Sequence, residues 1–284
     1  NKGRHPHILV MSATPIPRTL GLILYGDLDL SIMDTLPSGR KPINTYCVSS
    51  KLHERIYNYI KRHLDDGEQA YIVCPLVEEG EETGAELSAT AYYEELKGGA
   101  FAGYPIGLLH GKQKPNQKEE VMRKFSNGEI KVLVATTVIE VGVDVPQATV
   151  ILIENAERFG LSQLHQLRGR VGRGQLQSDC ILVSDTKNEE TKMRLQTLCK
   201  TGDGFKIAEE DLKMRGPGDF IGNRQHGLPL FKLADLSADM ETLQKAGEAA
   251  EAVLSDDPKL SKPQHADLKA ELAEMFRQAE HALS

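Results

Sequence analysis

The sequence predicts an α/β fold in which helices cover both faces of a parallel sheet, followed by a helical hairpin and an α-helical C-terminal tail. Through residues 43–186, short apolar runs of strand length alternate with longer helical stretches, the pattern of a parallel sheet. Hydroxyl or acidic residues follow several of these runs, as expected where ligands bind at the carboxyl ends of parallel strands. After residue 187 the apolar residues recur at helical spacing.

The first 42 residues read as the end of one domain and a linker. The apolar run His7–Met11 predicts a strand, a helix is expected from about Ile16, and Leu28–Met33 predicts a further strand. The segment Pro37–Pro42 is basic and rich in turn residues. We therefore expect a domain boundary there, with residues 1–36 on one side and 43–186 on the other.

Residues 43–186 carry the repeating strand and helix pattern. Strands are predicted at Tyr46–Val48, Ala70–Cys74, Ile106–Leu109, Val132–Ala135, Val150–Ile153 and Cys180–Val183. Helices are predicted at about Leu52–Leu64, Leu87–Leu96 and Gln117–Phe125, and over the arginine-rich segment Leu161–Gly174. Acidic or glycine-containing loops are expected at Glu78–Glu86 and Ile139–Pro146.

Two helical parts follow. Residues 187–234 predict a hairpin with helices at about Glu189–Cys199 and Phe205–Met214, a glycine turn between them and a glycine-rich loop from Arg215. Residues 235–284 predict helices near Ser237–Leu254 and Ala266–Leu283. The apolar residues of this tail favour core packing over partner binding.

Composition and charge exclude several classes of protein. The net charge of −7 argues against a protein that coats nucleic acid by bulk attraction, and residues 235–284 hold 11 acidic and 5 basic residues, or −6 of that total. No apolar run approaches the roughly 20 residues that span a bilayer, so we expect no membrane partner and a cytoplasmic location. The four scattered cysteines predict reduced core thiols, and no metal-ligand cluster is evident. A start without Met, almost directly on a strand pattern, favours a fragment of a longer protein.

The arginine-rich segment is the main candidate site. Arg168, Arg170 and Arg173 lie within six residues, and no acid occurs in residues 159–178. A planar guanidinium matches phosphate oxygens in a bidentate way, so this density predicts an anion site, with Gly169 and Gly172 letting the backbone approach the anion. The alternative is a solvated basic helix face.

Other candidates follow the predicted strands and would share one edge of the sheet: Ser12, Thr14, His110, Thr136, Glu140 and Asp144. Three of them also have a structural explanation. Thr14 is suited to cap a helix, His110 to be a hydrogen-bonded residue at a strand end, and Asp144 to cap a turn.

Four segments together resemble the conserved motifs of superfamily 2 helicases. The segment Ser12–Leu20 resembles motif III, Tyr71–Val77 motif IV, Val134–Asp144 motif V and Gln163–Arg173 motif VI. Their order and spacing also match those of the motifs. Gln166, Gly169, Arg170 and Arg173 fall at the Q-x-x-G-R-x-x-R spacing of motif VI. The longer forms SATPIPRTL and LHQLRGRVGRG are similar to the RecG and Mfd families, and residues 194–227 resemble their translocation motif, in a form more like that of RecG.

This resemblance implies a RecA-like lobe that shares an ATP site with a preceding lobe. The G-x-x-x-x-G-K-[ST] phosphate loop does not occur in the sequence, so ATP and Mg²⁺ are expected to be held mainly by that first lobe. Arg170 and Arg173 are expected to act as arginine fingers and Gln166 to position the phosphate or water. Gly142 and Asp144 are expected to bridge the nucleotide and the DNA.

The resemblance also implies a set of residues for DNA contact or coupling. These are Ser12, Thr14, His110, Gly111, Thr136, Thr137, Glu140, Arg194, Arg215, Arg224 and Gln225. Arg194, Arg215 and Gln225 are expected to form the network that links ATP-driven closure to movement on duplex DNA. Arg215 is equally suited to cap the second hairpin helix.

The implied activity is that of a bacterial, monomeric ATP-dependent DNA helicase, which translocates on duplex DNA and remodels branched DNA in recombination and repair. Its expected partners are branched and double-stranded DNA, the first lobe and a wedge domain of the same protein. The isolated chain is expected to be inactive. An Mfd-like translocase and a DNA-binding module without hydrolysis are the alternatives, and the hairpin disfavours an RNA helicase.

Overall fold

The computed structural model describes residues 40–75, 89–136, 144–215 and 240–281, and the isolated residues 9, 11, 31 and 33. For residues 212–215, 240, 241, 243, 244, 276 and 278–281 only the backbone is described. The described residues divide into two compact units, one holding residues 40–211 and the other holding the C-terminal helices. The elements predicted before residue 37 and the loop Glu78–Glu86 lie outside the described residues, those isolated positions excepted.

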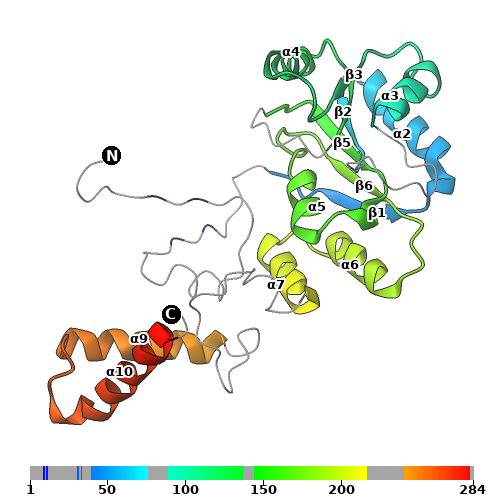
Figure 1. The fold of residues 1–284 in the computed structure, drawn as a ribbon. Coiled ribbons are helices and arrows are strands. Elements are labelled where there is room, and N and C mark those ends of the chain that lie inside the picture. The colour runs from blue at the N-terminus through cyan, green and yellow to red at the C-terminus, as the bar shows by residue number, and fades with distance from the viewer. Residues whose placement is uncertain are drawn as a thin grey trace. The chain divides into compact units, whose positions relative to one another are not determined.

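A six-stranded parallel sheet forms the centre of the first unit (Figure 1), in the order β1-β6-β5-β2-β4-β3. The strands are β1 Asn44–Val48, β2 Gln69–Val73, β3 Ile106–Leu109, β4 Val132–Ala135, β5 Ala148–Ile153 and β6 Asp179–Val183. Every residue of β2, β4, β5 and β6 is buried, because helices cover both faces of the sheet. This burial explains why these strands appear in the sequence as nearly continuous apolar runs. All six predicted strands and the predicted RecA-like α/β fold are confirmed.

Helices cover both faces of this sheet (Figure 1). Helices α2 (His53–Asp65) and α3 (Ala89–Gly98) lie on one face, and α4 (Pro115–Ser126) and α5 (Leu161–Arg168) on the other. Alternate residues of β2 serve the two faces: Ile72 packs in the cluster formed with α2 and α3, whereas the ring of Tyr71 lies 4.9 Å from that of Phe125 in α4. The strand period of two thus divides one apolar run between two cores.

The arginine-rich segment departs from its prediction as a helix. Helix α5 ends at Arg168, so Arg170 and Arg173 lie in the turn that follows. Gly172 has φ +72, in the left-handed region, and a Cβ there would lie 2.9 Å from Cγ1 of Ile43. The backbone at Gly172 therefore approaches another part of the protein rather than a ligand.

The predicted hairpin helices are confirmed as α6 (Glu189–Lys200) and α7 (Gly204–Arg215). Asn188 caps α6 by accepting a hydrogen bond from the Thr191 amide at 3.1 Å. Asp203 likewise accepts from the Phe205 amide at 2.9 Å at the start of α7. A carboxamide and a carboxylate in the connections thus accept main-chain hydrogen bonds at the starts of the two helices.

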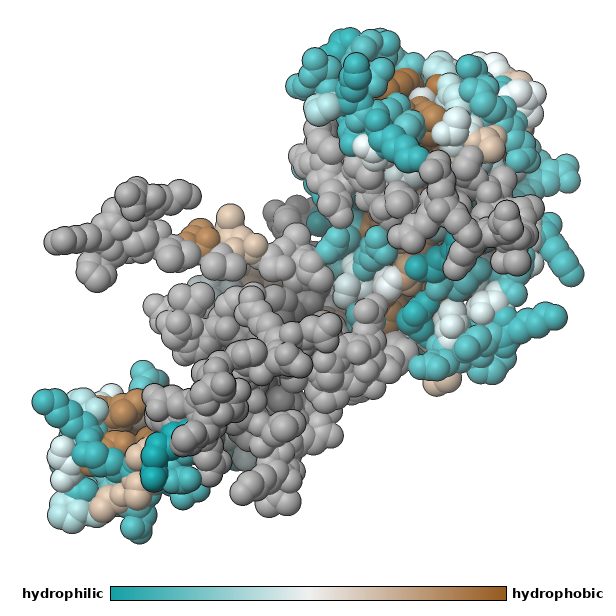
Figure 2. Space-filling view, in the orientation of Figure 1, coloured by the Kyte–Doolittle hydropathy of each residue, from teal (hydrophilic) through white to brown (hydrophobic). Residues whose placement is uncertain are grey.

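The second unit contains α9 (Met240–Asp256) and α10 (Ala266–His281), near the two predicted tail helices. Asp257 organises their connection, because it accepts from the Lys262 amide at 2.7 Å and lies 3.1 Å from Nδ1 of His265. Leu268 and Met275, predicted to face a core, are 47% and 48% exposed. Figure 2 shows hydrophobic residues among hydrophilic ones on the visible face of this helix pair.

The four cysteines are free thiols, as predicted. Cys74 and Cys180 are buried, and burial raises the pKa of each to about 12. Cys47 is exposed, so its prediction as a core thiol is wrong. Across the described ranges, no helix is both long and apolar enough to cross a membrane.

Candidate nucleotide-facing and DNA-facing site

The carboxyl ends of the strands bring together residues that are far apart in sequence. Ser49 follows β1, His110 follows β3, Thr136 follows β4 and Glu154 follows β5. All the strand pairs are parallel, so these residues lie along one edge of the sheet. Ligands of open α/β sheets bind at this edge.

Arg173 and Asp144, both predicted for the nucleotide site, form an ion pair through Nη1 and Oδ1. Arg173 also donates from Nε to the Gly169 carbonyl at 3.0 Å. Their side chains are 29% and 64% exposed. Since exposed ion pairs contribute only about 0–1 kcal/mol, an incoming phosphate can replace the carboxylate at small cost.

Arg170 lies at the start of the same turn and is half-buried. Its guanidinium makes no ion pair or hydrogen bond with any residue that the structure describes, while its amide donates to the Leu167 carbonyl at 3.0 Å. Burial raises the pKa of Tyr71 in β2 to about 12, and the positive charges of Arg170 and Arg173 oppose that rise. The turn therefore offers one guanidinium available to an anion and a second held by an exposed carboxylate.

Arg168 differs from the other two arginines, and its prediction as part of the anion site is wrong. It is 4% exposed, and its Nη1 donates to the Leu198 and Thr201 carbonyls, each at 2.8 Å. Its Nη2 lies 2.8 Å from Nδ1 of His165. Burial and the charge of Arg168 lower the pKa of His165 to about 4, so this imidazole is neutral and accepts the hydrogen bond.

Arg194, predicted for the coupling network, lies on α6. Its Nη2 donates to the main-chain carbonyl of Glu157 at 2.6 Å, in the 3-10 helix Ala156–Arg158 that precedes α5. Its two predicted partners are not described: Arg215 ends α7 with its side chain outside the described atoms, and Gln225 lies outside the described residues. The contact with the segment leading into motif VI is nevertheless direct.

His110 and Thr136, predicted to contact DNA, lie at neighbouring strand ends. The Thr136 amide donates to the Leu109 carbonyl at 3.1 Å, which places it beside His110. The His110 amide donates to Oε1 of Gln113 at 3.1 Å, and Gly111 follows in an exposed turn. Thr136 is 7% exposed, and its hydroxyl has no hydrogen-bond partner among the described residues.

The remaining predicted site residues are placed less fully. Gln166 lies on α5 with partial exposure and polar contacts of its own. Seven residues lie outside the described residues: Ser12, Thr14, Thr137, Glu140, Gly142, Arg224 and Gln225.

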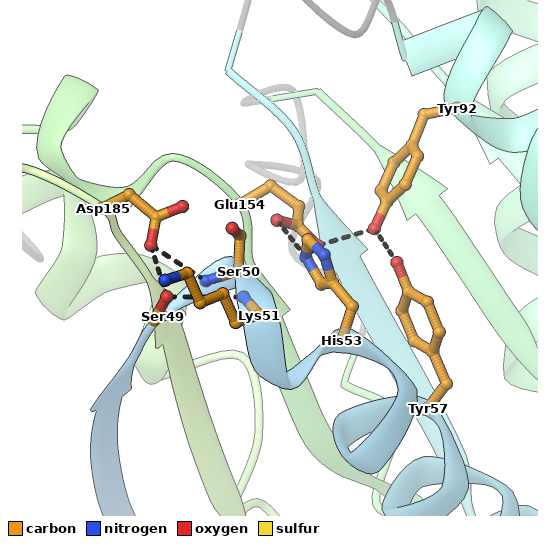
Figure 3. A network of polar contacts seen from close by, with 8 residues as sticks. All are labelled: Ser49, Ser50, Lys51, His53, Tyr57, Tyr92, Glu154 and Asp185. Carbon is orange, nitrogen blue, oxygen red and sulfur yellow. Dashed lines mark hydrogen bonds and ion pairs between the residues drawn. The ribbon is translucent and has the colours of Figure 1, made fainter.

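A buried polar cluster at the same edge was missed by the sequence analysis (Figure 3). Nε2 of His53 lies 3.0 Å from both carboxylate oxygens of Glu154, and the Tyr92 hydroxyl donates to Oε1 of Glu154 at 2.6 Å. The Tyr57 hydroxyl lies 2.5 Å from that of Tyr92. The hydrogen bond to Glu154 raises the pKa of His53. An acid directly after the apolar run of β5 was the available signal.

A second contact in Figure 3 joins the ends of β1 and β6. Oδ1 of Asp185 accepts from the Ser49 hydroxyl at 2.6 Å and from the Ser50 amide at 3.1 Å. These hydrogen bonds lower the pKa of Asp185. Together with the Glu154 cluster, they pair polar groups of the protein with one another along this part of the edge.

Two family models match the chain. Residues 51–175 match the helicase conserved C-terminal domain, and residues 201–282 match the C-terminal part of domain 3 of ATP-dependent DNA helicase RecG. The parallel sheet and the arginine turn after α5 therefore define a RecA-like C-terminal helicase domain of superfamily 2.

Individual relatives show which superfamily 2 helicase the chain is similar to. The chain is 46% identical over 273 residues to ATP-dependent DNA helicase RecG of Bacillus subtilis, covering 96% of this chain and 40% of the relative. It is 50% identical over 275 residues to ATP-dependent DNA helicase RecG of Synechocystis, covering 97% and 33%. A solved structure of RecG bound to a three-way DNA junction matches with 46% identity and a TM-score of 0.66, covering 82% of this chain and 30% of that one. The chain is thus similar to RecG over nearly all of its own length and spans less than half the length of these relatives.

Proposed function

We propose that the protein acts as an ATP-dependent DNA helicase that translocates on duplex DNA and remodels branched DNA such as stalled forks and Holliday junctions. The similarity to RecG supports the reaction, and the solved RecG relative bound to a three-way junction supports the substrate class. The single observation that carries the proposal is the Arg170 guanidinium, which is half-buried and unpaired among the described residues.

In this proposal ATP and Mg²⁺ bind between two RecA-like lobes, and the first lobe holds most of the phosphate and metal contacts. The available guanidinium of Arg170 fits a phosphate, and that of Arg173 fits one once Asp144 is displaced. An arginine placed across the cleft stabilises the charge that spreads over the transferred phosphoryl group. Gln166, on α5 before the turn, positions the phosphate or water.

The DNA backbone lies along the neighbouring strand ends in this proposal. The buried hydroxyl of Thr136 is suited to donate to a phosphate oxygen, since no described residue accepts its hydrogen. Thr136 follows β4, and His110 and Gly111 follow the neighbouring strand β3. Contacts of this kind position the protein on DNA without reading its sequence.

The proposal is tested with the full-length protein and synthetic three-way junctions, forks and linear duplex of equal length. We expect ATP hydrolysis to be stimulated by DNA, most strongly by the branched substrates, and the junctions to be unwound. Stimulation that is equal on linear and branched DNA would support the Mfd-like alternative. DNA binding without any hydrolysis would leave only a binding module.

The arginine assignment has its own test in the full-length protein. Arg170→Ala is expected to lower kcat for ATP hydrolysis by about 10³- to 10⁵-fold, the range found for arginine fingers, while DNA affinity changes little. Arg62→Ala, on the exposed part of α2, is the matched control. Normal turnover in the Arg170 variant would remove the arginine-finger role.

The isolated chain is expected to be inactive as an ATPase because it supplies one side of the proposed cleft. The expected result is no hydrolysis by the chain alone and hydrolysis by the full-length protein under the same conditions. Turnover by the chain alone would show that its own residues complete the ATP site.

A further inference from the structure

Arg168 is a buried cation with an unusual set of partners. It is 4% exposed, and no carboxylate in the described part of the chain pairs with it. Its hydrogen bonds go instead to two main-chain carbonyls and one neutral imidazole, all at 2.8 Å. A buried charge is costly without such compensation, so this arrangement must be maintained by the fold around it.

The two carbonyls belong to the C-terminal end of α6. Leu198 lies in the last turn of that helix, and Thr201 is the residue just beyond it. The last carbonyls of a helix have no partner within the helix and carry partial negative charge. The Arg168 guanidinium donates hydrogen bonds to these carbonyls. Their partial negative charge takes the place of the carboxylate that would otherwise pair with a buried arginine.

A second contact ties α5 to the other hairpin helix. The Ser162 hydroxyl donates to Oδ2 of Asp211 in α7 at 3.2 Å, and Asp211 is 2% exposed. Ser162 and Arg168 lie in the first and last turns of α5, which is 8 residues long. One short helix therefore contacts both helices of the hairpin.

The same short helix leads directly into the turn that carries Arg170 and Arg173. The Arg170 amide donates to the Leu167 carbonyl at 3.0 Å and the Gly169 amide donates to the His165 carbonyl at 3.0 Å, so the turn continues from the end of α5 without a break. Arg173 returns to the Gly169 carbonyl through Nε. A shift of this turn must therefore displace the end of α5, where Arg168 holds α6.

We propose that Arg168 is a positioning residue that couples the nucleotide-facing turn, through α5, to the α6–α7 hairpin, so that closure around the nucleotide moves the hairpin. This inference rests on the proposed helicase function and adds a residue to it. Arg168 touches neither nucleotide nor DNA in this scheme. Loss of Arg168 should leave ATP hydrolysis in place but uncouple hydrolysis from movement of the α6–α7 hairpin.

The test uses the full-length protein and compares ATP hydrolysed with three-way junctions unwound. Arg168→Lys retains the positive charge, but one ammonium cannot match the planar fork that reaches two carbonyls and an imidazole. We expect this variant to keep its kcat for ATP hydrolysis, whereas junctions unwound per ATP fall by about 5- to 150-fold, the usual range of coupling between sites. Arg62→Lys, which alters an exposed arginine of α2, should leave the ratio unchanged.

Arg168→Met is the more severe variant and extends the series. Where it folds, as judged by circular dichroism and its unfolding midpoint, its ratio should be no higher than that of Arg168→Lys. Where it does not fold, Arg168→Lys decides alone. A structural role without coupling would leave the ratio of junctions unwound to ATP hydrolysed unchanged, even if both rates fell, and that result would overturn the inference.

The outcome for the unaltered protein separates this inference from the proposed function. If the unaltered protein hydrolyses no ATP with DNA, the proposed function fails and the inference fails with it. If it hydrolyses ATP and unwinds junctions while the Arg168 variants keep the normal ratio, only the inference fails.

Discussion

Two buried charged side chains, Glu154 directly after β5 and Arg168 at the end of α5, each contact a histidine. Glu154 is 3% exposed and contacts His53, whereas Arg168 is 4% exposed and contacts His165. The hydrogen bond to the carboxylate raises the pKa of His53. Burial and the guanidinium lower the pKa of His165 to about 4.

The comparison shows that a buried carboxylate raises the pKa of the histidine that it contacts, whereas a buried guanidinium adds to the lowering of that pKa by burial. The partners differ as well. Glu154 is held by side chains of α2 and α3, so it ties two helices to the sheet. Arg168 is held mainly by main-chain carbonyls at the end of α6, so it ties the hairpin to the end of α5, next to the turn that carries Arg170 and Arg173. The first region stabilises the domain, and the second connects two of its moving parts in our proposal.

Removing the carboxylate should produce the largest change in stability. In Glu154→Ala, the His53 imidazole and the buried Tyr92 hydroxyl lose their common partner. We expect the free energy of unfolding to fall by about 3–5 kcal/mol, the cost of breaking a buried pair. Urea unfolding of the chain measures it. Glu129→Ala, at an exposed carboxylate before β4, is the control, and equal stability of the two variants would contradict the role of Glu154.

Tyr92→Phe should have a smaller effect on the same cluster. The substitution removes one donor to Glu154 and the partner of the Tyr57 hydroxyl, while the ring remains. Hydrogen bonds to charged groups contribute about 1.5–3 kcal/mol, so we expect a loss in that range by urea unfolding. Tyr93→Phe, on the next residue of α3, retains Tyr92 and serves as the control. A loss no greater than in the control would show that the Tyr92 hydroxyl adds nothing.

The pH dependence of stability tests the contact between His53 and Glu154. The pKa of His53 is raised in the folded protein, so its contribution is fully present below the ordinary value of about 6.5 and is lost as the pH rises through the raised value. The difference in stability between the unaltered chain and His53→Gln should therefore shrink as the pH rises above about 6.5. His165 is present in both proteins and cancels in this difference. A difference that grows with pH would contradict the assignment.

Much of the fold follows from the sequence, because the apolar runs of β2, β4 and β5 are long enough for buried strands and little else. The end of α5 does not follow so directly. Gly169 and Gly172 were read as room for a ligand, but Gly169 ends α5, and the left-handed backbone at Gly172 lies so close to Ile43 that a Cβ there would clash.

The site was predicted less completely, because the spacing of the three arginines along the chain does not show which of them is buried. Arg168 is buried by contacts with Leu198 and Thr201, which are 30 and 33 residues away. Glu154 was missed because its partners His53 and Tyr92 are 101 and 62 residues away. Such tertiary contacts leave no local pattern, whereas the ion pair of Arg173 with Asp144 joins two residues that the motifs had already selected.

The smallest effect concerns the protonation of His165 and needs no change in stability to be observed. With a pKa of about 4, its imidazole should remain neutral above about pH 5, with Nδ1 unprotonated and accepting from Arg168. Imidazole ¹⁵N chemical shifts in the unaltered chain should therefore stay constant for His165 at neutral pH, while those of His53 change. In Arg168→Lys a positive charge remains nearby and burial persists, so His165 should still titrate below about 6.5. Titration of His165 near about 6.5 in the unaltered chain would show that Nδ1 is not the acceptor that holds Arg168.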